Sequence, residues 1–206
     1  MHKYSLEEGK LLVNAARTAI ELSLRMEHLK NDIIYKRVSG LSYKDGVFVT
    51  IEHYPTRTLR GCMGYHSGRE DIGKSVIEAA LSSAFEDSRF TPLSLKELDH
   101  ITIEVSILTE PKEISGSAET RNRKIKIGKD GLIVRYGFHE GLLLPIVAVE
   151  QGWDSKKFLE EVCIKAGISP EMWRQPAVKF YTFETQVFKE ESPEGNVIER
   201  HIKNVH

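Results

Sequence analysis

The amino-acid sequence predicts an α+β fold in two lobes, each a small mixed or antiparallel sheet with helices, the two related by internal duplication. Helix-like and strand-like patterns alternate along the chain. In addition, Lys44-Asp45-Gly46 and Lys129-Asp130-Gly131 each precede an apolar run, and after each of them the order strand, strand, helix, strand follows. The competing interpretation is that Lys-Asp-Gly is only a common turn sequence.

In the first half, a long helix is predicted behind Ser5 and Glu8, which form the sequence of a capping box. Its apolar face consists of residues at three- and four-residue spacing: Leu12, Ala15, Ala19, Leu22, Met26 and Leu29. A second helix is predicted from Ile72 to Ala84, with Asp71 as its N-cap. It must end before Pro92.

Strands are predicted on both sides of that second helix. One covers Val47 to Glu52 after the turn at Asp45-Gly46, and another covers Leu59 to Tyr65 after a break at Pro55. The stretch HITIEVSILT, residues 100–109, alternates apolar and polar side chains, which is the pattern of a third strand.

The second half shows the same order of elements. After the strand behind Gly131, GLLLPIVAVE is a second strand candidate, DSKKFLEEVCIKAG is typical of a capped helix, and VKFYTFETQVF predicts a last strand. The polar stretch PKEISGSAETRNRK separates the halves. We therefore expect one domain over residues 1–206, with sub-lobes of approximately 1–110 and 111–192. A partly packed C-terminal tail carries Val197, Ile198 and Ile202.

Composition excludes several classes of protein. A chain of 206 residues can bury roughly 70% of its unfolded surface, enough for a true core. The formal net charge is −1, so a basic surface for nucleic acid or membranes is not expected. No run approaches the ~18 apolar residues of a membrane span, and MHKYSLEEGK lacks the apolar part of a signal peptide. We therefore expect a cytoplasmic location.

The residues that bind metals and cofactors do not occur in the usual spacings. Cys62 and Cys163 form no CxxC pair, and the eight histidines show no HxxxH or HExxH spacing. Neither a disulfide framework nor a metal site is expected. GxGxxG and Walker sequences are also missing from the sequence, so no cofactor is predicted. Cys163, within a predicted helix, is interpreted as a core residue.

TLRGCMGYH, residues 58–66, is unusual because two glycines flank a cysteine within a predicted strand. Regular alternation places four residues on one face: Arg60, Cys62, Gly64 and His66. The core face then takes Leu59, Met63 and Tyr65. Arg60 would lie roughly 6.6 Å from Cys62 and favour its thiolate, whereas His66, roughly 13 Å away, could not act as its base.

Glycine weakens a strand unless another backbone or a ligand approaches it closely. Gly61 and Gly64 are therefore interpreted as bare backbone which, together with the Arg60 guanidinium, holds a carboxylate or phosphate. The alternative is a bulged strand in which Cys62 is a small buried hydrophobe.

A second polar group, EDSRF, follows the second predicted helix. In the structural interpretation Arg89 caps the helix carbonyls and pairs with Glu86. In the functional one, Asp87 or Glu86 orients Arg60 beside Cys62 in a cleft between the lobes. The expected ligand-binding residues are Arg60, Gly61, Cys62, Gly64, Glu86, Asp87 and Arg89, and Cys62 is also the candidate catalytic residue.

LRGCMG resembles the hexapeptide Leu-Arg-Gly-Cys-Ile-Gly, the signature of the AMMECR domain family. That family is named after the chromosomal region of a syndrome of Alport nephropathy, midface hypoplasia and elliptocytosis. GVFVTI, AAFEDSRF, PLSLKEL, LLPIVAVEQGW and FLEEVCIKAG are also similar to it, so the resemblance covers essentially the whole chain. Met63 replaces the usual isoleucine, a conservative exchange. Ile146 stands where a glutamine is expected, which would remove a polar contact from a second motif.

The resemblance implies a two-lobed α+β fold, no assigned activity, and Memo-type or radical-enzyme proteins as partners. Two functions remain open. A binding or accessory module would hold an anionic small molecule or partner group in the cleft, whereas an enzyme would use Cys62 as a nucleophile in acyl or group transfer. The first is favoured because the motif has no His-Asp arrangement nearby and burial opposes a Cys62 thiolate. A nucleic-acid or translation-related role ranks third.

Overall fold

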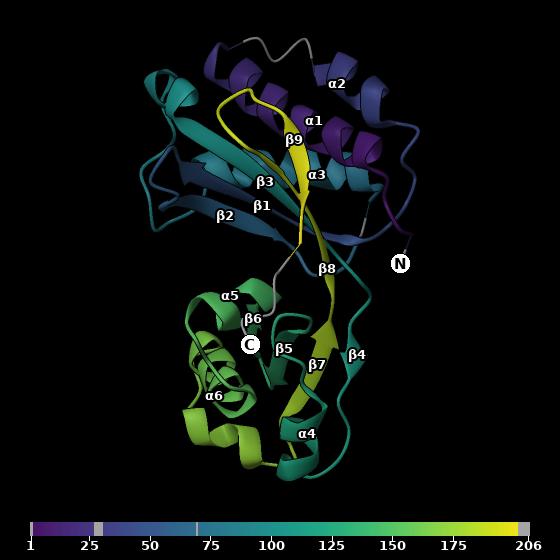
Figure 1. Cartoon of the computed structure of the whole chain (residues 1–206), viewed down its shortest axis with the longest axis vertical. Coiled ribbons are helices and arrows are strands. Elements are labelled where there is room, and N and C mark those ends of the chain that lie inside the picture. Colours follow the sequence, from purple (N-terminus) through teal and green to yellow (C-terminus); the bar gives the residue numbers. More distant parts are fainter. Residues whose placement is uncertain (1, 27–30, 69, 202–206) are drawn as a thin grey trace. The chain divides into compact units, whose positions relative to one another are not determined.

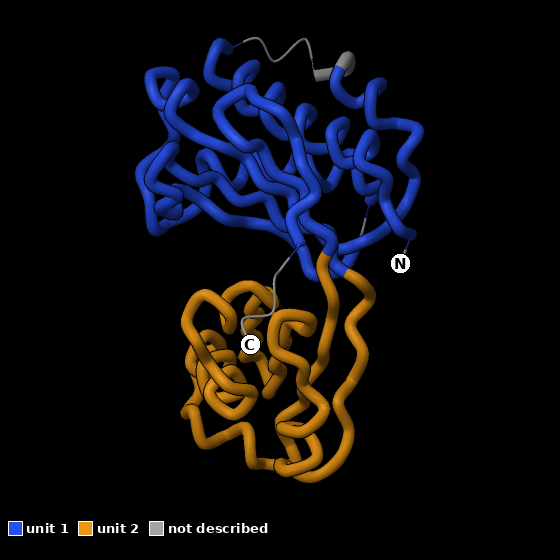
Figure 2. The backbone as a smooth tube through the Cα atoms, viewed as in Figure 1, with its two compact units in different colours: residues 1–108, 186–201 blue, residues 109–185, 202–206 orange. Residues whose placement is uncertain are grey.

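The computed structural model describes residues 2–26, 31–68 and 70–201. Helices and two separate sheets confirm the predicted α+β class. The chain divides into two compact units (Figure 2). Unit 1 comprises the described residues up to 108 together with 186–201, and unit 2 comprises residues 109–185. Leu29 and Ile202, which the sequence patterns include, lie outside the described residues.

Unit 1 contains a five-stranded sheet in the order β2-β1-β3-β8-β9, with its helices on one side (Figure 1). Its strands are β1 Gly46–His53, β2 Leu59–Tyr65, β3 Ile101–Leu108, β8 Thr185–Glu190 and β9 Val197–Arg200. Its helices are α1 Leu6–Leu24, α2 Asn31–Val38, α3 Ile72–Phe85 and the 3₁₀ helix η2 Leu95–His100. The LRGCMG motif is therefore the edge strand β2.

Helix α1 begins as predicted and ends earlier. Ser5 and Glu8 form the complete capping box, with the Ser5 hydroxyl accepting from the Glu8 N–H. The backbone of Met26 has a φ of 58°, the left-handed conformation that follows many helix ends. Apolar spacing alone did not indicate this end, because the periodicity continues past it.

Unit 2 contains a four-stranded sheet in the order β4-β7-β5-β6. Its strands are β4 Lys112–Glu113, β5 Gly131–Tyr136, β6 His139–Leu143 and β7 Lys179–Phe183. Its helices are α4 Ala118–Lys124, α5 Pro145–Glu150, α6 Ser155–Lys165 and the 3₁₀ helix η3 Pro170–Arg174. The predicted strand GLLLPIVAVE is wrong in its second half, because β6 ends at Leu143 and Pro145 is the first residue of α5. Ile146, the residue at the expected glutamine position, lies in α5 and is partly buried.

The two units share a local topology. The strands lie side by side in the order β2-β1-β3 in unit 1 and β6-β5-β7 in unit 2. In both units the chain forms the central strand first, then the edge strand, then helices, and then the strand on the other side of the central one. Gly46 and Gly131, from the two Lys-Asp-Gly turns, are the first residues of the equivalent central strands β1 and β5. This similarity agrees with internal duplication, which stays a prediction.

The last predicted strand is in fact two strands. β7 ends at Phe183 and β8 begins at Thr185, and the two belong to different sheets. Two hydrogen bonds join the point where the chain leaves unit 1 to the point where it returns, because Thr109 N–H donates to Glu184 O and Glu184 N–H donates to Thr109 Oγ1. Unit 2 is thus an insertion between β3 and β8.

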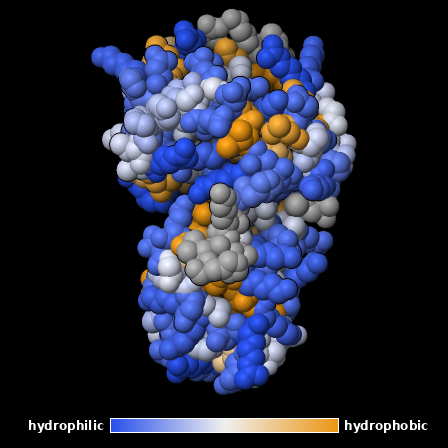
Figure 3. All heavy atoms as spheres, in the orientation of Figure 1, coloured by the Kyte–Doolittle hydropathy of each residue, from blue (hydrophilic) through white to orange (hydrophobic). Residues whose placement is uncertain are grey.

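Each unit has its own hydrophobic core. In unit 1, one face of the sheet packs against α1 and α3, with Val49, Ile103 and Val76 among the fully buried side chains. In unit 2, Phe158 and Phe180 are fully buried between α6 and the sheet. The face in Figure 3 is mostly hydrophilic with small hydrophobic groups. Among the described residues, no helix has both the length and the apolar composition needed to cross a membrane.

A buried ion pair holds α1 against the sheet of unit 1. Arg17 Nε and Nη2 donate to the two carboxylate oxygens of Glu190 at 2.5 and 2.6 Å. Arg17 also donates to Ile101 O, and Glu190 accepts from Ile103 N–H. Arg17 is 5% and Glu190 2% exposed. The pair therefore joins α1, β3 and β8, with both charges removed from water.

We expect Arg17→Met to lower the free energy of unfolding by about 3–5 kcal/mol, because it leaves the Glu190 carboxylate buried without its partner. Urea unfolding followed by circular dichroism measures this loss. The double variant Arg17→Met/Glu190→Met should lose less than the sum of the two single variants. Lys10→Met, which breaks an exposed pair with Glu7, is the control and should change stability by less than about 1 kcal/mol. A comparable loss in Lys10→Met would contradict this prediction.

Candidate functional site

The LRGCMG strand carries a β-bulge at its arginine. In the antiparallel pair of β1 and β2, Gly61 is opposite Ile51 and Leu59 is opposite Glu52, so Arg60 is an extra residue between them. The predicted strict alternation thus holds from Cys62 onward and is interrupted at Arg60. Leu59, which alternation assigned to the core face, is 41% exposed.

Both glycines of the motif lie where another backbone passes close by. A Cβ at Gly61 would be 2.2 Å from the carbonyl oxygen of Ser83 in α3. A Cβ at Gly64 would be 2.1 Å from Val47 O in β1. Real Cβ atoms do not approach this closely, so packing of α3 and β1 on β2 requires glycine at both positions. The space beside these glycines is occupied by the protein itself.

Ser83 fastens α3 to the two strands. Its hydroxyl accepts from Met63 N–H at 2.8 Å and lies 2.7 Å from both Val49 O and Ala79 O, either of which can accept its proton. The hydroxyl therefore connects an N–H of β2 to the facing carbonyl of β1. Ser83 is 1% exposed, so this contact is fully internal.

Arg60 is buried and its charge is paired. Its Nε donates to Glu97 Oε1 at 2.8 Å, and its Nη2 donates to Thr91 O at 2.8 Å. Partial burial of Glu97 opposes ionisation. The Arg60 guanidinium and the Ser94 hydroxyl and N–H outweigh it and lower the pKa of Glu97 to about 2. Arg60 is only 6% exposed, so it stabilises the segment after α3 and offers no free charge to a ligand.

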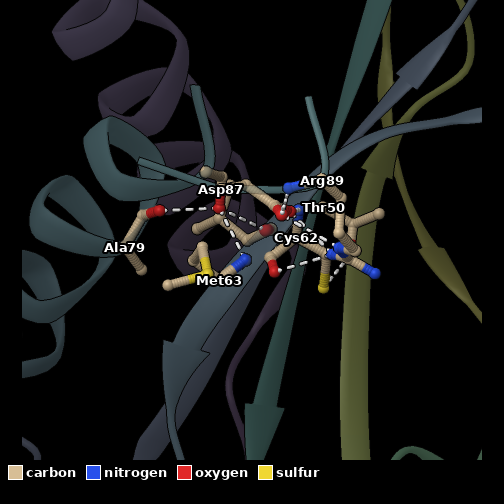
Figure 4. Close-up of polar contacts among 8 residues, drawn as sticks. Thr50, Cys62, Met63, Ala79, Asp87 and Arg89 are labelled. Carbon is tan, nitrogen blue, oxygen red and sulfur yellow. Dashed lines mark hydrogen bonds and ion pairs between the residues drawn. The ribbon is translucent and has the colours of Figure 1, made fainter. Parts of the chain in front are cut away.

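Asp87 and Arg89 together cover the edge of β2 at Cys62 (Figure 4). Asp87 Oδ2 accepts from Cys62 N–H at 2.9 Å, and Arg89 Nη2 donates to Cys62 O at 3.3 Å. Arg89 also donates to both oxygens of Asp87, and its guanidinium holds the pKa of that carboxyl below its usual range. Asp87 is buried, whereas the Arg89 side chain is 46% exposed.

The Cys62 side chain lies on the sheet face opposite α3. It belongs to a row of three polar side chains, Cys62 in β2, Thr50 in β1 and Glu104 in β3. Thr50 is the partner of Cys62 on one side and of Glu104 on the other. The Thr50 hydroxyl donates to Cys62 Sγ at 3.4 Å. Burial raises the pKa of the Cys62 thiol, while the Thr50 hydrogen bond and the Arg89 charge act in the opposite direction. The cation that acts on this thiol is therefore Arg89 and not Arg60.

Glu104 is the acid at the centre of this face. Burial raises its pKa, although Arg200 Nη1 lies 3.0 Å and Lys189 Nζ 3.9 Å from its carboxylate. Sequence reasoning did not single out Glu104, Ser83 or Glu97. A role for Glu97 could have been predicted, because Ser94 and Glu97 form a capping-box sequence, and the structure contains that capping box in η2.

Two predicted groups lie apart from this cluster. Glu86 is exposed and accepts from the Ser82 hydroxyl at 2.6 Å, so the structure does not place it with Arg60. Cys163 is fully buried in the core of unit 2, where burial raises the pKa of its thiol to about 12. Within the described parts of the chain, acids, cysteines and histidines form no group that could hold a metal ion.

Comparison with known proteins finds relatives over nearly the whole chain. Residues 13–188 match the model of the AMMECR1 family. A protein of Thermococcus gammatolerans is 44% identical over 204 residues, covering 96% of this chain and 97% of that protein. One of Methanocaldococcus jannaschii is 43% identical, covering 98% of this chain and all of the relative. The crystal structure of an uncharacterised protein from Pyrococcus horikoshii is similar with a TM-score of 0.86 at 43% identity, covering 95% and 97% of the two chains.

Gly61→Ala is expected to destabilise the protein by about 1–3 kcal/mol or more, because the new methyl group would overlap the Ser83 carbonyl. Chemical denaturation of the variant measures this. Gly40→Ala is the matched control, since nothing lies within 4 Å of a Cβ at Gly40, and it should be neutral or slightly stabilising. Equal stability of the two variants would show that the contact between β2 and α3 tolerates a side chain.

Proposed function

The chain belongs to the AMMECR1 family, and on this premise we propose that it is a binding module. Its ligand is an anionic small molecule or partner group, held at the LRGCMG motif by Arg89 on the Cys62 side of β2. The observation that carries this proposal is the Arg89 side chain, which is 46% exposed and whose guanidinium is fixed beside Cys62 by the buried carboxylate of Asp87.

Arg89 is prepared for an anion by the contacts it already makes. Its Nε and Nη2 are occupied by Asp87 and by Cys62 O. Among the residues that the structure describes, Nη1 has no hydrogen-bond partner, so its two N–H groups remain for a ligand oxygen. Since Asp87 fixes the plane of the guanidinium, little side-chain entropy is lost when the ligand binds.

The thiol chemistry supports binding over covalent catalysis. A nucleophilic cysteine needs a thiolate at working pH, whereas burial raises the pKa of Cys62 above its ordinary value. The charged groups that act on the thiol include two acids, Glu104 and Asp87, which add to this effect. The alternative function, group transfer with Cys62 as nucleophile, would require a much more acidic thiol.

We expect Arg89→Gln to abolish binding and Cys62→Ser to preserve most of it. The measurement is native mass spectrometry of the purified protein mixed with a cellular metabolite extract, scored by the mass adducts that survive desalting. Lys96→Gln removes the same charge from an exposed position in η2 and should retain every adduct. Circular dichroism of each variant separates loss of binding from loss of fold. Adducts that persist unchanged in folded Arg89→Gln would refute the proposed contact.

The pH dependence of Cys62 alkylation provides an independent test, carried out in the Cys163→Ala background. The folded-state pKa of Cys62 is raised, so the alkylation rate should rise only above the ordinary thiol value of about 8.5. Arg89→Gln should move the midpoint to still higher pH, because the Arg89 cation favours the thiolate. Rapid alkylation below about pH 7 would instead support the cysteine enzyme.

A further inference from the structure

Unit 2 contains a pocket of about 700 Å³ that involves none of the residues of the LRGCMG site. Three cationic side chains line it: Arg121 from α4, Lys156 from α6 and Arg174 from η3. Glu119 is the acid among its lining residues, and Trp173 contributes an aromatic ring. The lining therefore carries an excess of positive charge, although the chain as a whole is nearly neutral.

Arg121 is a buried cation without an acidic partner in the described part of the chain. It is 6% exposed, and its Nη1 donates to Trp173 O and Gln175 O, both at 3.1 Å. Its guanidinium lies over the Phe180 ring at 5.5 Å. Carbonyls and an aromatic face orient the guanidinium but leave its charge uncompensated, an arrangement that is costly unless an anion completes it.

Two buried N–H groups at this place also lack acceptors. Arg121 Nε and Trp173 Nε1 are the buried side-chain donors without a partner among the residues that the structure describes. Nearly all buried polar groups in native proteins are hydrogen-bonded, and these two, both on residues that line the pocket, have no acceptor from the described chain. Both atoms are shielded from solvent, so a ligand reaches them only when the Arg121 and Trp173 side chains turn toward the pocket. Both are donors only, which selects a ligand that presents oxygen acceptors.

The two exposed cations are free to turn toward such a ligand. Lys156 Nζ lies 3.7 Å from Glu160 Oε1, and Arg174 Nη1 lies 3.0 Å from Glu171 Oε2. Both cationic side chains are about half exposed. Ion pairs of this kind contribute little and exchange readily. Once Lys156 and Arg174 leave Glu160 and Glu171, the three cations of the lining face one acid, Glu119, which favours a doubly charged oxyanion over a singly charged one. Arginine binds phosphate oxygens with two parallel hydrogen bonds.

We propose that the pocket of unit 2 binds a phosphorylated small molecule. On binding, the Arg121 and Trp173 side chains turn so that Nε–H and Nε1–H donate to the phosphate oxygens, and Lys156 and Arg174 neutralise the remaining charge at the open side of the pocket. Glu119 is the group that opposes binding.

The test uses the full chain with Trp153→Phe, so that the emission of Trp173 alone reports the pocket. Phenyl phosphate is the probe, and benzoate, which carries the same ring and a single charge, is its control. We expect a saturable change of emission with phenyl phosphate and a much weaker one with benzoate. Equal affinity for both probes would overturn the assignment to phosphate, and no saturable change at millimolar phenyl phosphate would overturn the site.

Variants then assign the site to its residues. Lys156→Ser and Arg174→Ser should each weaken binding about fivefold, and Arg121→Lys, which keeps the charge but loses Nε–H, about tenfold. Glu119→Gln should tighten phenyl phosphate binding.

Lys165→Ser is the control. It removes an exposed cation from the other end of α6 and should have no effect. An equal loss in Lys165→Ser, or retained binding in folded Arg121→Lys, would contradict the proposal. Arg89→Gln should leave phenyl phosphate binding unchanged, so the two sites succeed or fail separately.

Discussion

The contact between Arg17 and Glu190 joins segments that lie at opposite ends of the chain. Arg17 belongs to α1, and Glu190 belongs to β8, which follows the whole of unit 2 in the chain. Ile103, whose N–H donates to Glu190, belongs to β3. Without this pair, β8 would bring an unpaired carboxylate under α1, next to the apolar side chains that fill the core of unit 1. The pair holds β8 at β3, and β8 carries Lys189, whose ammonium group lies 3.9 Å from the Glu104 carboxylate in the row of polar side chains beside Cys62.

The same core explains why the LRGCMG motif has its composition. Helix α3 lies so close to β2 that Gly61 has no room for a side chain, and the Ser83 hydroxyl enters between β2 and β1. Two of the six motif residues are therefore glycine for reasons of packing, and the arginine is committed to Glu97. A motif that identifies a family need not consist of residues that contact a ligand. Arg89, whose Nη1 has no hydrogen-bond partner among the described residues, lies beside the motif.

Sequence patterns predicted what depends on local periodicity. The capping box of α1, the start of α3, the alternation of β3 and the α+β class follow from neighbours in the chain, and the structure agrees with them. The bulge at Arg60 and its pairing with Glu97 could not be predicted, because both depend on partners 37 residues away or on another strand. The break between β7 and β8 was missed for a related reason, since alternation continues across Glu184 while the chain changes sheets.

Long-range closure of unit 1 has a consequence for the order of events on the ribosome. Helices α1 and α3 and strands β1 to β3 are complete once Leu108 has been synthesised, but the sheet lacks β8 and β9 until unit 2 has been added. At ordinary elongation rates this takes on the order of ten seconds. Throughout that interval the Arg17 guanidinium faces an open sheet edge without its carboxylate. The nascent chain therefore presents an incomplete domain whose last strands, β8 and β9, and whose protection from other chains, arrive only after unit 2 has been synthesised.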